Sequence, residues 1–279
     1  MKNGYNNKVT KSLFIIAILG IVSIQTYAET KEKTKFGVKG GINASTTFVS
    51  LPTPDYYTRY ETEYKFKIGF DAGIFVEFSL TKSLSFQPEL TLSLKGMQNE
   101  NFISLNRPPA SGYDMFEIHA IAKTSLYYVK LPLYVKLEFD LNNSSKLIAG
   151  IGPYFAYGIS GKMSSEFVFS ASKNHWIGEK HIFKEDDFNF DKSITWGNDN
   201  WSSENVMNWI REPYWHKSVK RLDGGISGFV GYELCNKWII TATYDFGLIN
   251  FLYPAEKWGE KLEGKMYNRT ISIALGYKF

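Results

Sequence analysis

The sequence has 279 residues, a formal net charge of +4 and one cysteine, Cys235. Three lysines near the N-terminus supply most of that charge, so the rest of the chain is nearly neutral and lacks the basic stripe that binds nucleic acid. A single cysteine cannot form an internal disulfide, so the fold must be stable without that cross-link.

The N-terminus is organised like a secretory signal peptide. Lys2, Lys8 and Lys11 precede an apolar run from Leu13 to Ile24, and residues 26–28 end in a small residue, alanine. The apolar run is shorter than the roughly twenty residues that a helix needs to span a membrane. We therefore expect residues 1–28 to be a cleaved export signal and residues 29–279 to form one mature domain.

Eight segments of the remaining chain alternate strictly between apolar and polar residues, which predicts β-strands rather than helices. They are residues 35–43, 65–78, 83–95, 127–139, 147–159, 223–234, 238–248 and 270–279. Because no long apolar run follows the leader, the mature chain could enter a membrane only as strands.

The connections between these segments alternate in length. Three are tight turns, near residues 81–82, 142–143 and 236–237, and four are long, near residues 47–64, 98–122, 162–219 and 251–267. In an up-and-down barrel all tight turns then lie at one rim and all long loops at the other. This asymmetry is typical of outer-membrane barrels, which have short periplasmic turns and long extracellular loops. We predict an all-β, eight-stranded, antiparallel, up-and-down transmembrane β-barrel.

The apolar face of each segment decides between a soluble barrel and a membrane barrel. Aromatic residues gather on it near the tight turns, as in the aromatic girdle of a membrane interface: Phe36, Phe78, Phe86, Phe139, Tyr232, Trp238 and Phe279. We therefore expect the apolar face to contact lipid and the polar face to line the interior.

The polar face carries many charges, which this reading places inside the barrel: Lys39, Lys67, Asp71, Glu77, Glu89, Lys95, Lys130, Lys136, Glu138, Asp223, Glu233, Asp245 and Lys278. Eight strands enclose only enough room for their own side chains. We expect acids and bases to pair there, because an isolated buried charge is costly. A proton pathway or ion conduction is the alternative.

Several short motifs resemble the PorT-like outer-membrane β-barrel proteins across essentially the whole mature chain. They are residues 36–43 (FGVKGGIN), 87–90 (QPEL), 129–133 (VKLPL), 150–154 (GIGPY) and 275–279 (LGYKF). The resemblance implies an eight-stranded barrel inserted by the barrel-assembly machinery, with Tyr277 and Phe279 of the last strand as the insertion signal. It implies little about activity, although the family takes its name from a member linked to protein secretion.

The connection at residues 162–219 is unusually long, and loops of this length are usually functional or disordered. It holds five of the seven tryptophans: Trp176, Trp196, Trp201, Trp209 and Trp215. So many aromatic residues argue against plain disorder, and residues 202–211 could form a short helix. We regard the loop either as a small folded cap or as a binding surface for a ligand or partner.

No catalytic residue, metal site or cofactor is predicted. His119, His175, His181 and His216 lie outside the predicted strands, and neither His-x-x-x-His nor His-Glu-x-x-His spacing occurs. His175 and His181 precede acids at residues 185–187, which could in principle bind a metal, but a solvated loop explains them better. A Gly-x-Ser-x-Gly elbow is also absent.

We therefore expect a non-enzymatic barrel in the outer membrane of a Gram-negative cell, with extracellular loops that have structural or binding roles. Its expected partners are outer-membrane lipid, the barrel-assembly machinery and an unidentified extracellular ligand or envelope protein. The alternatives are a component of a protein secretion or assembly complex, or an outer-membrane enzyme.

Overall fold

A computed structural model describes residues 34–50, 59–106, 115–142, 144–172, 176–187, 220–251, 255–257, 260–262 and 264–279. These residues form the strands β1 (Thr34–Ser50), β2 (Arg59–Ser79), β3 (Leu84–Asn106), β4 (Met115–Asn142), β5 (Ser145–Ser172), β6 (Trp176–Asp187), β7 (Leu222–Leu234), β8 (Trp238–Gly247), β9 (Ala255–Lys257), β10 (Glu260–Leu262) and β11 (Lys265–Lys278). The predicted export signal, residues 1–28, lies outside the described residues. The described residues include no helix that is both long and apolar enough to cross a membrane.

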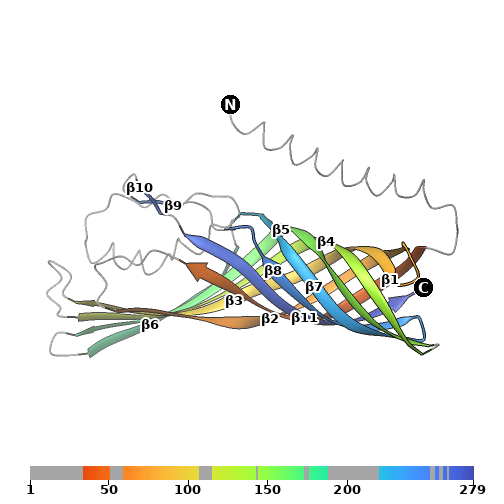
Figure 1. Cartoon of the computed structure of the whole chain (residues 1–279). Coiled ribbons are helices and arrows are strands. Elements are labelled where there is room, and N and C mark those ends of the chain that lie inside the picture. Colours follow the sequence, from red (N-terminus) through yellow and green to blue (C-terminus); the bar gives the residue numbers. More distant parts are fainter. Residues whose placement is uncertain are drawn as a thin grey trace.

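Eight of the strands form a closed antiparallel ring (Figure 1). The hydrogen-bonded order is β1, β2, β3, β4, β5, β7, β8 and β11, and β11 pairs with β1 to close the ring. The closing pair runs from Gly37 opposite Lys278 to Ser50 opposite Lys265. The predicted eight-stranded antiparallel barrel is confirmed.

The three predicted tight turns join β2 to β3, β4 to β5 and β7 to β8. In the first, the amides of Leu80 and Thr81 both donate to the carbonyl of Leu84. In the third, Cys235 and Asn236 have positive φ angles of 53° and 55°. Consecutive left-handed residues are favoured in hairpins because they match the twist of the paired strands. All three turns lie at the end of the barrel where β11 ends.

Strands β1 to β5 and β11 run further than the alternation predicted, so the predicted connections at 47–64, 98–122, 162–219 and 251–267 are too long. β3 and β4 stay paired up to Asn106 opposite Met115, and β5 continues to Ser172, where it forms a hairpin with β6. In β3 the extension has polar residues facing both ways, because Asn99 and Asn101 are buried whereas Gln98 and Glu100 are partly exposed. Outside lipid neither face has to be apolar, so the extension resembles a loop in the sequence.

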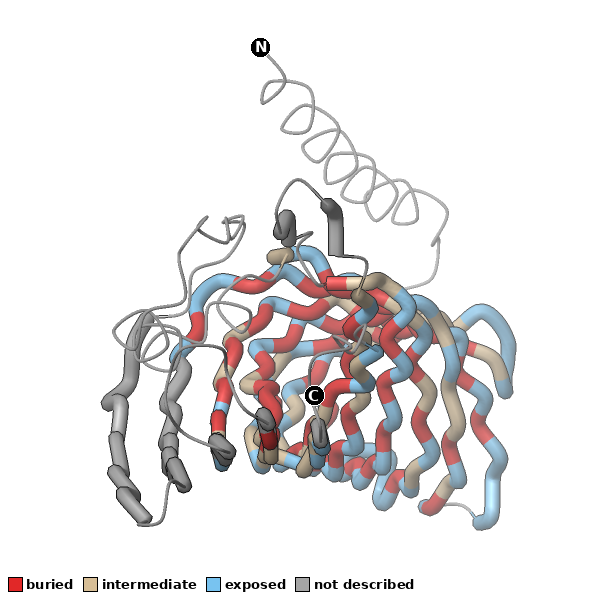
Figure 2. The backbone as a smooth tube through the Cα atoms, turned by 90° about the vertical axis from the view of Figure 1, so that its left-hand side faces the viewer, coloured by how far each residue is buried: buried red, intermediate tan, exposed pale blue. Residues whose placement is uncertain are grey.

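Residues along each strand of the ring alternate between an exposed and a buried side (Figure 2). The outward side is apolar, and Ile42, Ile68 and Val230 are more than 60% exposed. The inward side carries the charges, and Asp223 and Asp245 are completely buried. The apolar face therefore forms the outer wall of the barrel, as expected for contact with lipid.

Lys67 is the exception among the predicted inward charges. The pairing of β2 with β3 shifts register between Phe66 and Asp71. The Lys67 ammonium lies 2.5 Å from the hydroxyl of Ser125. Thr124 and Leu126 are buried inside the barrel, so Ser125 between them faces the outer wall. The bulge thus turns Lys67 to the outer wall, because a β-bulge reverses the alternation that follows it.

A closed, hydrogen-bonded ring should resist detergent until it is heated. We expect the protein to migrate faster on a detergent gel without boiling than after boiling, because the folded barrel stays compact in detergent. Identical mobility before and after boiling, together with fractionation as a soluble protein, would contradict a membrane barrel.

Candidate functional site: the charged interior

The barrel interior near the tight turns holds a cluster of ion pairs centred on Glu77. The carboxylate of Glu77 accepts hydrogen bonds from Lys136 and, at 3.0 Å, from Lys278. Lys278 also lies 2.6 Å from Glu233, and Lys136 lies 2.9 Å from Glu138. These residues come from β2, β4, β7 and β11, so the cluster connects strands on different sides of the ring.

An apolar layer separates this cluster from the middle of the barrel. It consists of Phe75, Tyr134, Ile148, Phe229 and Ile239, all buried. The rings of Tyr134 and Phe229 meet edge to face with 4.8 Å between centroids. The sequence analysis placed charged residues on the inner face and did not predict that the interior has an apolar layer of its own.

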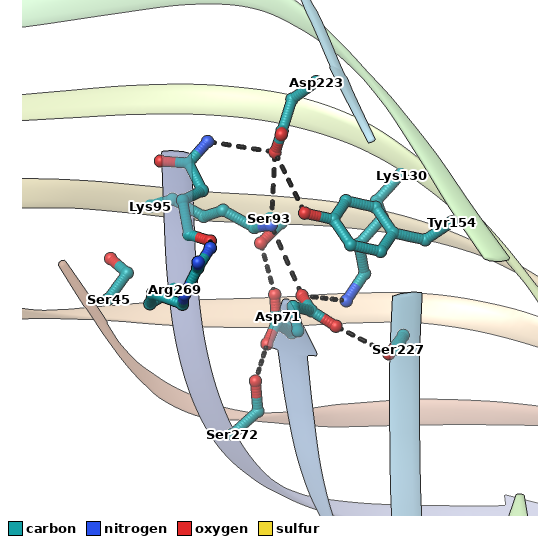
Figure 3. A network of polar contacts seen from close by, with 12 residues as sticks. Ser45, Asp71, Ser93, Lys95, Lys130, Tyr154, Asp223, Ser227, Arg269 and Ser272 are labelled. Atoms are coloured by element: carbon teal, nitrogen blue, oxygen red, sulfur yellow. Dashed lines mark hydrogen bonds and ion pairs between the residues drawn. The ribbon is translucent and has the colours of Figure 1, made fainter. Parts of the chain in front are cut away.

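Asp245 organises a second network in the middle of the barrel, and Figure 3 labels its partners Lys95, Lys130 and Ser227. Its carboxylate accepts hydrogen bonds from Lys130 at 2.8 Å, from Lys95 at 3.3 Å and from the Ser227 hydroxyl at 2.6 Å. Ser227 in turn contacts the Tyr134 hydroxyl at 2.7 Å. The network therefore reaches the apolar layer below it through one hydrogen bond.

Two further carboxylates belong to the same region (Figure 3). Asp223 accepts hydrogen bonds from the Asn268 amide at 2.9 Å and the Tyr154 hydroxyl at 3.5 Å. Asp71 accepts hydrogen bonds from the hydroxyls of Ser93 at 2.5 Å and Ser272 at 2.9 Å. A buried carboxylate is stable only when its oxygens are paired or hydrogen-bonded, and each of these three meets that condition.

A second apolar cluster lies beyond the central network, on the side away from the tight turns. It includes Met97, Leu126, Tyr128, Phe251 and Met266. Tyr154 belongs to both regions, because its ring packs in this cluster while the Lys95 ammonium lies 5.0 Å from the ring centroid. The interior is thus a stack of charged and apolar layers filled by side chains.

The predicted inward charges other than Lys67 line this interior, and Lys39 pairs with Glu89 at 2.6 Å. Among the described residues, no group of three histidine, cysteine or acidic side chains is placed to hold a metal ion. His119 and His181 lie within β4 and β6 rather than in loops, which corrects the sequence analysis. His175 and His216 lie outside the described residues.

The predicted binding residues of the long loop fall largely outside the described residues. Trp176 is the first residue of β6, whereas Trp196, Trp201, Trp209 and Trp215 are not described, nor is the predicted helix at 202–211. The grouping of the five tryptophans therefore stays a prediction.

The predicted insertion signal lies at the end of β11. Phe279 is 76% exposed on the outer wall, and its amide donates to the carbonyl of Phe36 at 2.9 Å. The Tyr277 ring packs between Phe279 and Trp238, with centroid distances of 5.5 Å and 4.9 Å. These aromatic rings sit together at the tight-turn rim, where a membrane interface favours them.

Comparison with known proteins identifies the family of this chain. Residues 25–253 match the outer membrane protein beta-barrel domain. The chain belongs to this family. Membership implies localisation in the outer membrane, and it agrees with the closed ring and its apolar outer wall.

Solved outer-membrane barrels are similar to the chain at low sequence identity. Ail of Yersinia pestis, in complex with the heparin analogue sucrose octasulfate, is 11% identical with a TM-score of 0.32; the match covers 88% of this chain and 99% of that one. Neisserial surface protein A is 13% identical, with a TM-score of 0.28 and coverage of 89% and 100%. OprG from Pseudomonas aeruginosa is 10% identical, with a TM-score of 0.27 and coverage of 88% and 96%. No curated protein matches the sequence.

The ion pair of the buried Glu89 with the largely buried Lys39 tests the role of the interior charges. Glu89→Leu should destabilise the barrel by about 3 to 5 kcal/mol, because it leaves Lys39 without its partner inside the barrel. The neighbouring outward substitution Leu90→Ile should cost less than about 1.5 kcal/mol. Urea unfolding in detergent micelles measures both. A cost below about 1 kcal/mol for Glu89→Leu would mean that the pair is dispensable.

Deletion of Phe279 tests the insertion signal. We expect loss of Phe279 to reduce insertion into the outer membrane strongly, because it removes the exposed aromatic end of the closing strand. Deletion of Asn200, in the long connection, should leave insertion unchanged. Quantifying the heat-modifiable form in purified outer membranes compares the two. Equal insertion of both variants would contradict a terminal signal.

Proposed function

We propose that the protein is a non-enzymatic outer-membrane barrel that anchors extracellular segments for a structural or binding role. One observation carries this proposal: buried side chains fill the interior and its charges are largely ion-paired, whereas β2 to β5 continue well past the level where the ring ends (Figure 1). The accessible part of the molecule on the cell surface is thus this projecting sheet and its connections, not the interior.

The filled interior argues against transport of ions or solutes through the barrel. Lys95, Lys136, Tyr128, Tyr134 and Tyr154 are all less than 2% exposed. Opening a channel through the barrel would require the ion pairs of Glu77 and Asp245 to break in a low-dielectric interior, which is costly. An eight-stranded barrel is also only wide enough for its own side chains.

The projecting sheet supplies a rigid base for a contact surface. β3 and β4 pair as far as Asn106 opposite Met115, and β5 pairs with β6 from Lys162 opposite Asp187 to Ser172 opposite Trp176. The long connection that follows β6 contains four of the five predicted binding tryptophans. Tryptophan anchors often carry much of the energy of recognition, so a ligand or envelope partner on this segment is part of the proposal.

We also propose that the protein is PorT-like, that it is exported with a cleaved leader and that the barrel-assembly machinery inserts it. The five PorT-like motifs support membership of that group, and the leader at residues 1–28 supports export of a cleaved precursor in a Gram-negative cell. The aromatic end of β11 supports insertion by the barrel-assembly machinery. The PorT-like resemblance also keeps a role in a secretion or assembly complex as the alternative.

Removal of the long segment tests the binding role. Residues 162–219 can be excised and Gly161 joined to Lys220 by a short turn, because Gly158 and Arg221 are already hydrogen-bonded across β5 and β7. The ring of eight strands should still close and remain heat-modifiable, while capture of partners from detergent-solubilised outer membranes should fall. Quantitative mass spectrometry of the captured proteins measures the difference.

A second variant, with only residues 107–114 replaced by a short turn, provides the control and should keep its partners. If the excised protein fails to fold, the segment belongs to the core of the barrel. If it folds and still captures the same partner, the long segment is not the binding surface. Secretion proteins among the captured partners would favour the alternative role.

A further inference from the structure

The outer wall formed by β1, β8 and β11 has an uneven distribution of charge. Its outward residues between Phe36 and Ser50, between Trp238 and Phe246, and between Lys265 and Phe279 include no acid. They include two cations, Arg269 and Lys265, and both lie on β11 at the end away from the tight turns. Two positive charges at one rim, without an outward acid on these described strands, favour an anionic neighbour.

Arg269 is held in a defined geometry on this wall. Its guanidinium carbon lies 3.8 Å from the centroid of the Phe246 ring, which is itself 41% exposed on the outside. Nη1 donates to the carbonyls of Gly247 at 2.8 Å and Asn268 at 2.9 Å. Both hydrogen bonds use the same nitrogen, so they orient the planar group and leave its other edge for a further acceptor.

The surroundings of Arg269 suit a polar headgroup. Lys265 is exposed and lies opposite Ser50, which is also exposed, in the pairing of β11 with β1. Between Lys265 and Arg269, the Tyr267 ring packs near Phe48 of β1, with 6.5 Å between centroids. Two cations, a hydroxyl and two aromatic rings thus share one stretch of the wall.

The wall below Arg269 is apolar down to the tight-turn rim. Ile271, Ile273 and Leu275 follow on the same side of β11 and are 48%, 58% and 51% exposed. A ligand that extends from Arg269 along β11 would therefore need a charged head and long apolar chains. A soluble anion would use only the upper part of this surface.

We propose that Arg269 and Lys265 bind the phosphate groups of a phosphorylated, acylated glycolipid in the outer leaflet of the outer membrane. The guanidinium fork matches a phosphate oxygen pair in geometry and charge. The acyl chains of the same molecule lie along Ile271 and Ile273, so one lipid satisfies both parts of the surface.

A looser contact between an arginine and an aromatic ring occurs on the neighbouring wall. The Arg221 guanidinium lies 5.9 Å from the centroid of the outward Tyr157 ring, and its Nη1 donates to the carbonyl of Gly158 at 3.0 Å. Arg221 precedes β7, which pairs with β8. Cations stacked on outward aromatic rings therefore mark this rim at two places, and the aromatic residues of the opposite rim have no such partner among the described residues.

The inference uses the outer-membrane placement that the family implies, and it does not depend on the proposed binding role of the long segment. The protein without residues 162–219 should bind the glycolipid as well as the full chain does. A failure of partner capture would therefore contradict only the proposed binding role, and a failure of lipid binding would contradict only the glycolipid proposal.

Binding of a diphosphorylated glucosamine disaccharide with acyl chains, and of its dephosphorylated form, tests the proposal. The folded full-length protein in mixed micelles should bind the phosphorylated lipid at least tenfold more tightly in native mass spectrometry, and the preference should weaken as salt screens the charges. Arg269→Gln combined with Lys265→Gln should abolish the preference. Arg269→Lys should retain only part of it, because lysine keeps the charge but loses the planar fork.

The combination of Lys82→Gln and Lys237→Gln is the matched control, since it removes two exposed cations from the opposite rim. It should leave the preference unchanged, and boiling-dependent mobility confirms that each variant is folded. Equal binding of the two lipids by the unmodified protein would overturn the proposal, and this result needs no variant. A folded Arg269 and Lys265 double variant that keeps the preference would overturn it as well.

Discussion

The pairing of β11 with β1 is the interaction on which the rest of the structure depends. The hydrocarbon of a membrane offers no hydrogen-bond partner to a backbone amide or carbonyl, so a sheet can exist there only if it has no free edge. The last strand meets the first along its whole length, from Lys278 to Lys265. Closure then forces every side chain of the ring either outward or inward, and the strict alternation of the sequence is the consequence.

Closure also explains why so many charges can be buried in a narrow barrel. Lys278 lies next to the C-terminus, yet its ammonium contacts Glu77 of β2 and Glu233 of β7. Residues far apart in the chain become neighbours only after the ring has closed. Replacing one member of such a pair leaves the other charge buried alone, so the clusters favour this one register of the strands over shifted alternatives.

The alternation predicted the ring well, because lipid on one side and a filled interior on the other impose a period of two. It placed Glu77, Lys136 and Asp245 correctly on the inner face. It failed at Lys67, since a bulge leaves no mark in a simple alternating pattern. It also missed that Phe75 and Phe229 face inward, because an aromatic side chain suits either environment.

The alternation also predicted the ends of the strands poorly, for a physical reason. Beyond the membrane the selection for an apolar outer face disappears, so the upper part of β3 alternates between polar residues on both sides. The sequence likewise predicts a loop where β5 forms a hairpin with β6. Strand pairing across chain segments, rather than local composition, determines where these strands end.

The two rims of the outer wall differ, and the difference gives the barrel a direction in the membrane. On β8 and β11 the outward residues nearest the tight turns are aromatic rings with no cation stacked on them, among them Trp238, Tyr277 and Phe279. The exposed cations of this rim, Lys82 and Lys237, lie in the turns themselves. The opposite rim carries Arg269 stacked on Phe246. An interface rich in fixed phosphates favours a guanidinium, whereas rings without a cation fit any headgroup region. Because short turns face the periplasm in barrels of this kind, we expect the rim with Arg269 to lie in the outer leaflet, where phosphorylated glycolipid would neutralise it.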